Sequence, residues 1–100
     1  MITKSELKFI DPQYFNILQL GCFAIYLQSK NTKHFWAIQV EEYPTFRHFK
    51  IYHKHNINDQ YHRHRDSRNI HAAIEHIKSH DAFQLNGRKH INNPTLTTVL

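Results

Sequence analysis

The alternation of apolar and polar residues predicts three antiparallel strands in the first half of the chain. Trp36, Ile38 and Val40 occupy every second position, which is the period of a half-buried strand. Phe49 and Ile51 repeat this spacing further along the chain. We expect strands at residues 22–28, 34–41 and 46–55, separated by polar turns at 29–33 and 42–45. Short connections of this kind predict an antiparallel meander.

A short helix is predicted before the meander, over residues 11–20. Asp11 can cap the first free N–H groups, and Pro12 at the first helical position loses no hydrogen bond. Gly21 is typical of a helix end. The alternative is a strand that runs from Phe15 straight through to residue 28.

A second and clearer helix is predicted after the meander. Asp66 or Ser67 would cap it, and it would run to about residue 80. Its apolar residues are spaced three and four apart, which gives one apolar stripe. These residues are Ile70, Ala73, Ile74 and Ile77.

Together these elements predict one α+β domain over residues 1–100, of order α-β-β-β-α. An antiparallel meander of three strands would carry the second helix on one face, and residues 61–65 would add a fourth strand in the alternative reading. Residues 1–10 and 88–100 are expected to be weakly ordered, although Thr95–Leu100 has the propensity of a late strand. We expect the core to contain Trp36, Ile38, Phe49, Ile51, Ile70, Ile74 and Ile77.

Composition favours a cytoplasmic protein without a membrane segment. Residues 1–10 contain no apolar run of the kind that a secretory signal needs. The longest apolar run, at 17–27, is shorter than the about 20 residues that cross a bilayer. The lone Cys22 excludes an intramolecular disulfide, suits a reducing compartment and is expected to be buried.

Positive charge is concentrated in residues 47–68. This stretch holds six of the thirteen Lys and Arg residues against two Asp residues, so it supplies +4 of a formal net charge of +5. A basic surface of this kind favours polyanionic partners such as nucleic acid or an acidic protein.

Cations and aromatic residues alternate in this stretch, which is typical of a surface that contacts phosphates and stacks bases. We therefore predict a non-enzymatic module that binds nucleic acid, and the alternative is a module that recognises an acidic protein surface. The predicted contact residues are Lys50, Tyr52, Lys54, Tyr61, Arg63, Arg65 and Arg68. Arg63, Arg65 and Arg68 fall near the start of the second helix, where free N–H groups also favour phosphate.

Ten histidines raise the question of a metal site. A hairpin closed by residues 56–60 would place four imidazoles on one sheet face, as in a zinc or nickel cage, and a further pair lies on the second helix. These residues are His53, His55, His62 and His64, with His76 and His80 as the helical pair. No Cys, Asp or Glu lies beside these pairs at ligand spacing, so we predict no metal site and no cofactor.

Enzymatic motifs are absent from the sequence. It has no Gly-x-Ser-x-Gly elbow, and two glycines are too few for a phosphate-binding loop. A metal-independent ribonuclease is the third hypothesis, since it needs a histidine base and a cation beside the phosphate. His34, His62 or His64 would act with Arg63 and Arg65.

The predicted element order is similar to that of the double-stranded-RNA-binding fold and of the small toxin ribonucleases built on it. Residues 17–23, with Gly21 and Phe23, resemble the helix and Gly-Phe of these toxins, and His34 resembles their strand-borne histidine. The glycine-serine pair expected before that histidine is absent here. Such a resemblance implies contact with RNA.

Overall fold

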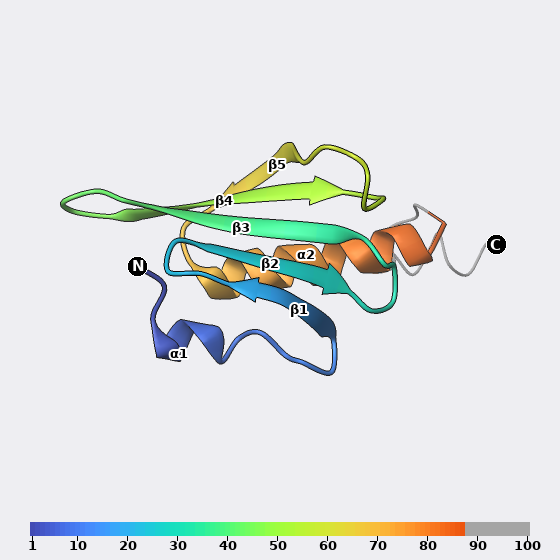
Figure 1. The fold of residues 1–100 in the computed structure, drawn as a ribbon, viewed down its shortest axis with the longest axis horizontal. Helices are drawn as coiled ribbons and strands as arrows, with labels where there is room; N and C mark the ends of the chain where they lie inside the picture. The colour runs from blue at the N-terminus through green and yellow to red at the C-terminus, as the bar shows by residue number, and fades with distance from the viewer. Residues whose placement is uncertain (88–100) are drawn as a thin grey trace, which may run out of the picture.

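The computed structural model describes residues 1–87. The predicted weakly ordered segment 88–100, including the late strand at Thr95–Leu100, lies outside the described residues. In the described part, a five-stranded antiparallel sheet has its strands in chain order, followed by one long helix (Figure 1). The elements are α1 (Lys4–Leu7), β1 (Phe15–Leu20), β2 (Ala24–Ser29), β3 (Phe35–Glu42), β4 (Arg47–Lys54), β5 (His62–Ser67) and α2 (Ile70–Leu85).

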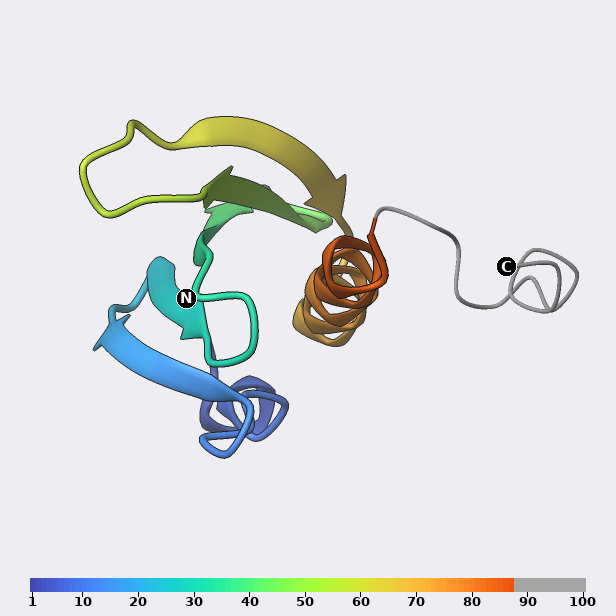
Figure 2. The same cartoon turned by 90° about the vertical axis from the view of Figure 1, so that its right-hand side faces the viewer.

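The sheet has two chemically different faces because residues alternate across a strand. In β3 and β4, Trp36, Ile38, Phe49 and Ile51 point to one side, where they are at most 1% exposed. We call this side the covered face, since α2 runs along it in both views (Figures 1 and 2). The opposite side is the open face, and its residues include Tyr52. The alternation of burial predicted for β4 is thus present, whereas in β3 Phe35 and Ala37 on the open face are buried as well.

Helix α2 contributes an apolar stripe to the core. Its N-cap is Asn69, whose side chain accepts a hydrogen bond from the backbone N–H of Ala72 at 2.7 Å. The helix therefore begins after the predicted caps, because β5 continues through Ser67. All seven predicted core residues are buried, and they belong to one cluster that also contains Phe15, Ile25, Leu27, Val40 and Ala73.

The helix predicted over residues 11–20 is not formed. Asp11 closes a turn instead, with its side chain accepting from the N–H of Gln13 and its carbonyl from those of Tyr14 and Phe15. Residues 15–20 are extended, as in the alternative reading, but the chain reverses after Leu20 and these residues pair antiparallel with β2. No single strand therefore runs from Phe15 through to residue 28. Gly21 closes the β1–β2 turn, where an added Cβ would lie 3.0 Å from the carbonyl oxygen of Ala24.

The resemblance to the toxin ribonucleases therefore fails in its first half. The residues that resembled their helix form β1, and Gly21 lies in a hairpin turn. An antiparallel meander followed by a C-terminal helix is present as predicted, but the sheet has five strands among residues 1–87 instead of the predicted three or four.

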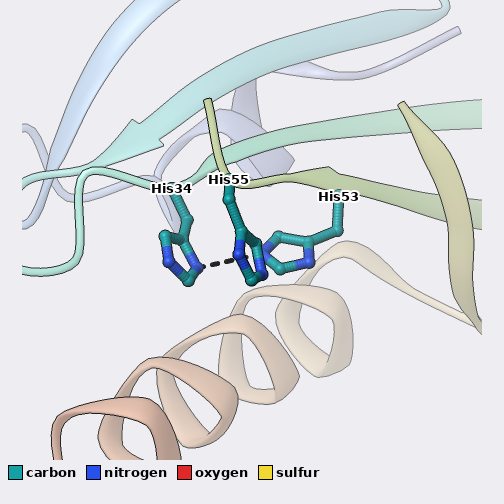
Figure 3. Close-up of side chains that lie close together, drawn as sticks. All are labelled: His34, His53 and His55. Atoms are coloured by element: carbon teal, nitrogen blue, oxygen red, sulfur yellow. Dashed lines mark hydrogen bonds between the residues drawn. The ribbon is translucent and has the colours of Figure 1, made fainter. Parts of the chain in front are cut away.

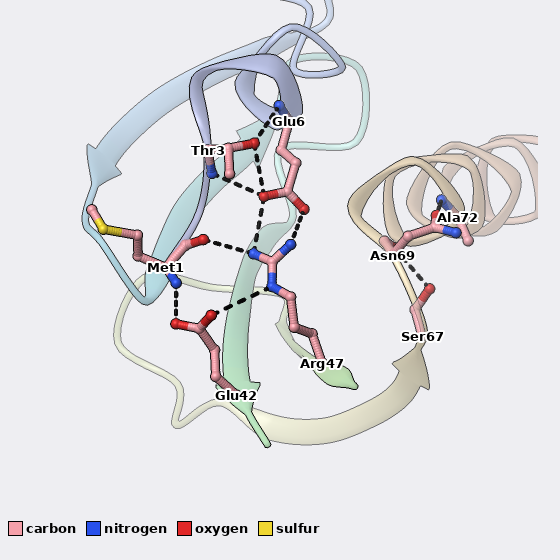
Figure 4. A network of polar contacts seen from close by, with 8 residues as sticks. All are labelled: Met1, Thr3, Glu6, Glu42, Arg47, Ser67, Asn69 and Ala72. Atoms are coloured by element: carbon pink, nitrogen blue, oxygen red, sulfur yellow. Dashed lines mark hydrogen bonds and ion pairs between the residues drawn. The ribbon is translucent and has the colours of Figure 1, made fainter. Parts of the chain in front are cut away.

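The short helix at the start of the chain is α1. Thr3 and Glu6 form a reciprocal capping box, with Thr3 Oγ1 accepting from the N–H of Glu6 and Glu6 accepting from the N–H of Thr3. Arg47 donates to both carboxylate oxygens of Glu6 at 2.8 and 2.9 Å and to the carbonyl of Met1 (Figure 4). Arg47 also lies 3.8 Å from a carboxylate oxygen of Glu42. This predicted member of the basic stretch is therefore engaged in holding α1 against β4.

The described chain contains no helix that is both long and apolar enough to cross a membrane. Cys22 is a free thiol and is exposed, which contradicts the expected burial. It lies in the turn between β1 and β2, where its carbonyl accepts a 2.7 Å hydrogen bond from the N–H of Ile2. Of its apolar neighbours in the sequence, Leu20 ends β1 and Ala24 begins β2, whereas Phe23 lies in the same turn and is also exposed.

Candidate functional site

The predicted nucleic-acid contacts separate into two groups in the structure. Five of them lie on the open face or at its margin, on β4, on β5 and just before β5: Lys50, Tyr52, Lys54, Tyr61 and Arg63. The other two, Arg65 and Arg68, line a groove between β5 and α2. The division arises at a bulge in the β4–β5 pairing, where Ile51 pairs with Arg65 but Tyr52 pairs with Arg63.

Three tyrosines surround a shallow hollow on the open face. They come from β2, β4 and the segment before β5, and the hollow of about 220 Å³ is lined by Ala24, Tyr26, Ala37, Gln39, Tyr52 and Tyr61. The rings of Tyr26 and Tyr61 lie 6.2 Å apart between centres and are tilted by 58°. The hollow is smaller than typical small-molecule pockets of about 300–1,000 Å³. It therefore suits one flat ring rather than a whole cofactor.

Cations lie directly against these rings. Lys54 Nζ is 4.6 Å from the ring centre of Tyr61, and the guanidinium carbon of Arg63 is 5.9 Å from that of Tyr52. At such distances cations are attracted to the ring faces. Cation and ring thus form adjacent parts of the same surface.

Two carboxylates partly neutralise this surface. Lys50 Nζ lies 2.9 Å from Glu41, and Arg63 donates from Nε to Asp66 at 2.8 Å. His48 Nε2 also lies 2.9 Å from Asp66. Exposed ion pairs of this kind contribute only about 0–1 kcal/mol each, so a phosphate can replace the carboxylate at small cost.

Arg65 and Arg68 line a separate groove between β5 and α2. It has a volume of about 510 Å³ and is also lined by Glu75. Arg65 Nη1 donates to Nδ1 of His76 at 3.2 Å. The predicted phosphate site at the helix entrance thus contains acidic as well as basic groups, and the N–H of Ala72 is already capped.

The largest concentration of titratable groups lies on the covered face. Seven of the nine histidines that the structure describes form one continuous set of ring contacts, which we call the histidine cluster. Its members are His34, His53, His55, His62, His64, His76 and His80. They come from β4, the residue directly after it, β5, α2 and the turn before β3, and Figure 3 shows three of them between the strands and the helix.

Trp36 packs against three members of the histidine cluster. Its buried indole stacks on His53 with ring centres 4.1 Å apart, and it meets His64 and His80 edge to face at 5.4 and 5.5 Å. The indole Nε1 is buried, and no hydrogen-bond partner for it lies among the described residues. A polar atom is therefore enclosed beneath the imidazoles.

The turn between β2 and β3 places His34 in the cluster. Lys33 adopts a left-handed conformation with φ of 65°, and the N–H of His34 donates to Thr32 Oγ1. Thr32 in turn donates to Asp81 on α2 at 3.0 Å, which anchors the turn to the helix. Nδ1 of His34 then lies 3.0 Å from Nε2 of His53 (Figure 3).

Burial makes the inner imidazoles weak bases. It lowers the pKa of His53 to about 3, with the neighbouring histidines, led by His34, adding to the effect. Burial, His64 and Arg65 lower the pKa of His76 to about 4. The pKa values of His34 and His64 are also lowered, mainly by burial. These four rings are therefore neutral at pH 7.

The third hypothesis, a ribonuclease, required His34, His62 or His64 beside Arg63 and Arg65. Arg63 lies on the open face, whereas His62 and His64 belong to the cluster on the covered face. Arg65 does lie by the cluster, at His76. The arrangement thus separates one of the two proposed cations from the proposed bases.

Several of these residues were not identified as site residues from the sequence. Tyr26 was assigned to a strand without a role. His34 was considered as a ribonuclease base but not as a neighbour of the other histidines, from which it is distant in sequence. The alternation of β2 places Tyr26 on the same face as Tyr52, so a five-stranded pairing scheme would have revealed the hollow. His76 and His80 were recognised as a helical pair, but no sequence signal places α2 over β4.

The exposed edge of the sheet offers a further surface. β1 has partly exposed apolar side chains at Ile17, Leu18 and Leu20. It contains no charged residue, so it does not match the acidic protein partner that the sequence suggested.

Comparisons with protein-family models, with curated proteins and with solved structures gave no match for this chain.

Proposed function

We propose that the open face of the sheet binds single-stranded nucleic acid, with bases on the tyrosines and phosphates on the cations beside them. The observation that supports this most is the hollow between Tyr26, Tyr52 and Tyr61. Aromatic side chains stack on any base, and each stacked base contributes about 1–3 kcal/mol. Lys54 and Arg63 lie against two of these rings, which brings charge to the place where the backbone of a stacked nucleotide would run.

A single strand fits this surface better than a duplex. The bases of a duplex are already stacked and paired, so they are not available to tyrosine rings. Among residues 1–87, the predicted cations on this surface are Lys50, Lys54 and Arg63, two of which have carboxylate partners. We therefore expect modest affinity with a shallow salt dependence, since each phosphate contact adds about 0.7 to the log–log slope for a single strand.

The test is a titration of labelled oligothymidine, followed by fluorescence anisotropy at low salt. Tyr52→Ala should weaken binding about 5-fold to 150-fold, as expected for the loss of one stacked base. Tyr43→Ala is the matched control, because Tyr43 is exposed in the β3–β4 turn and stacks on Phe46 away from the hollow. Tyr52→Phe should retain binding, and a duplex of the same length should bind more weakly.

Three results would contradict the proposal: no binding at low salt, an equal loss in Tyr43→Ala, or equal affinity for polyglutamate of matched length. The last result would assign the surface to an acidic protein partner, because polyglutamate has the charge of the oligonucleotide without its bases.

A further inference from the structure

Two groups of three histidines have the spacing of metal ligands. In each group, one ring nitrogen from every member lies within 4.8 Å of the others. The groups are His34, His53 and His55, and His53, His62 and His64. Both groups need His53, and a neutral imidazole ligates one ion at a time. The two groups therefore cannot each bind an ion at the same time.

The arrangement of the rings distinguishes the two groups. Imidazoles bound to one ion at about 2.0–2.1 Å radiate from it, so their planes are inclined and their centres are well separated. His34 and His55 instead stack nearly parallel, at 13° and 4.2 Å. The rings of His53, His62 and His64 are inclined by 60° to 76°, with centres 5.3, 5.5 and 6.3 Å apart. The second group has the geometry of a ligand set.

His53 is oriented by two neighbours. It stacks on Trp36, and its Nε2 lies 3.0 Å from Nδ1 of His34. Histidine ligands usually donate their second ring N–H to a nearby acceptor, which fixes the tautomer and the ring position. When His53 donates from Nε2 to His34, its Nδ1 keeps a free lone pair. His34 then acts as a positioning residue.

We propose that His53, His62 and His64 bind one divalent first-row transition ion, of the zinc, copper or nickel type. Imidazole nitrogen suits these ions, whereas magnesium and calcium prefer oxygen ligands. Neither group contains a carboxylate among the described residues. His62 is exposed, so water has access to the coordination position that three protein ligands leave open.

This proposal replaces the sequence-based prediction of no metal site. That prediction rested on the absence of Cys, Asp or Glu at ligand spacing beside the histidine pairs. The structure pairs His53 with His62 and brings His64 to the same side through the bulge. The ligand set is therefore complete without an acidic or thiol group. It lies on the covered face, so it is independent of the nucleic-acid surface.

The test uses metal-free protein without a histidine tag, titrated with Zn²⁺ in competition with a chromophoric chelator. Cu²⁺ provides a second readout, because Trp36 is the sole tryptophan and its ring contacts His53 and His64, so bound Cu²⁺ should quench its fluorescence. We expect one Zn²⁺ per chain. His62→Ala should weaken binding about 100-fold or more, and His34→Ala about 10-fold to 100-fold, the usual effect of losing a supporting hydrogen bond.

His71→Ala and His55→Ala are the controls, and both should leave affinity essentially unchanged. His71 lies on α2 with a side chain that is 58% exposed and outside the cluster. His62 and His55 are exposed, so their substitution should preserve the fold, which circular dichroism checks. The proposal is overturned by the absence of stoichiometric binding, or by equal losses in His71→Ala and His62→Ala. It is also overturned if His55→Ala removes binding while His62→Ala does not, since the ion would then occupy the other group.

Discussion

The imidazole of His53 lies nearly flat against the indole of Trp36, with ring centres 4.1 Å apart and planes inclined by 27°. Both side chains are buried, at 2% and 0% exposed. The stack joins β3 to β4 at the end of the sheet where the apolar core gives way to the histidine cluster. His53 therefore belongs to the core by packing and to the proposed metal site by chemistry.

His53→Phe should separate these two roles. A phenyl ring can keep the stack on Trp36, and substitutions of similar volume usually cost less than about 1.5 kcal/mol. The variant should therefore fold, yet it should lose the quenching of Trp36 by Cu²⁺ because both ring nitrogens are gone. Urea denaturation and a fluorescence titration check the two parts. Full quenching in the folded variant would mean that His53 is not a ligand.

Ile74→Asp should destabilise the fold severely. Ile74 is 1% exposed on α2, so the substitution buries an unpaired carboxylate in the core, at a cost of about 4 kcal/mol or more. Leu85→Asp, at the exposed end of the same helix, should change stability by no more than about 0.5 kcal/mol. Thermal melting compares them, and equal midpoints would mean that α2 does not pack on the sheet through Ile74.

Tyr14 should make stability sensitive to alkaline pH. Its hydroxyl donates to Asp81 at 2.7 Å, while Asn31 donates to it and Lys78 lies over its ring. Burial, followed by the bond to Asp81, raises the pKa of Tyr14 above its ordinary value of about 10. The unfolded chain then loses this proton more readily than the folded chain. The stabilisation is fully present below about pH 10 and is lost as pH rises further.

Tyr14→Phe isolates this contribution. At neutral pH the variant should lose about 1.5–3 kcal/mol, the usual value of a hydrogen bond to a charged group. Above about pH 10 its unfolding free energy should fall less steeply than that of the wild type. Urea denaturation at several pH values measures both effects, and parallel pH curves would show that Tyr14 does not carry the alkaline response.

Arg47→Ala should cost more stability than the loss of an open-face cation. Arg47 makes three hydrogen bonds that connect β4 to Glu6 and Met1, and the side chain of Glu6 is only 16% exposed. We expect a loss of about 1.5–3 kcal/mol. Lys50→Ala, which removes an exposed pair with Glu41, should cost less than about 1 kcal/mol. Equal losses in urea denaturation would contradict the structural role of Arg47.

The core could be predicted from the sequence because alternation and helical spacing report burial directly. Trp36, Ile38 and Ile74 follow these periods, and each is buried. The prediction of a helix over residues 11–20 was wrong because the apolar residues from Tyr14 to Leu18 fit both a helix and a strand. Pairing with β2 favours the strand. The sequence did contain the signal for α1, since Thr3 and Glu6 have capping-box spacing.

The candidate sites were harder to predict because they depend on strand register. A bulge between Arg63 and Arg65 places these neighbours on different sides of β5, and no local sequence feature marks it. His34 and His53 are 19 residues apart and meet only through the β3–β4 pairing. Short-range sequence patterns could therefore identify the candidate site residues, but they could not assign each of them to the open or the covered face of the sheet.

The most direct test of the proposed function is an NMR titration of ¹⁵N-labelled protein with unlabelled oligothymidine, because it reports which face is contacted. Binding on the open face should shift the amide resonances around Tyr26, Tyr52 and Tyr61 in one saturable process, and should leave those around Ile74 in place. Shifts centred on Arg65 and Arg68, or no saturable shift at low salt, would contradict the nucleic-acid surface proposed for the three tyrosines.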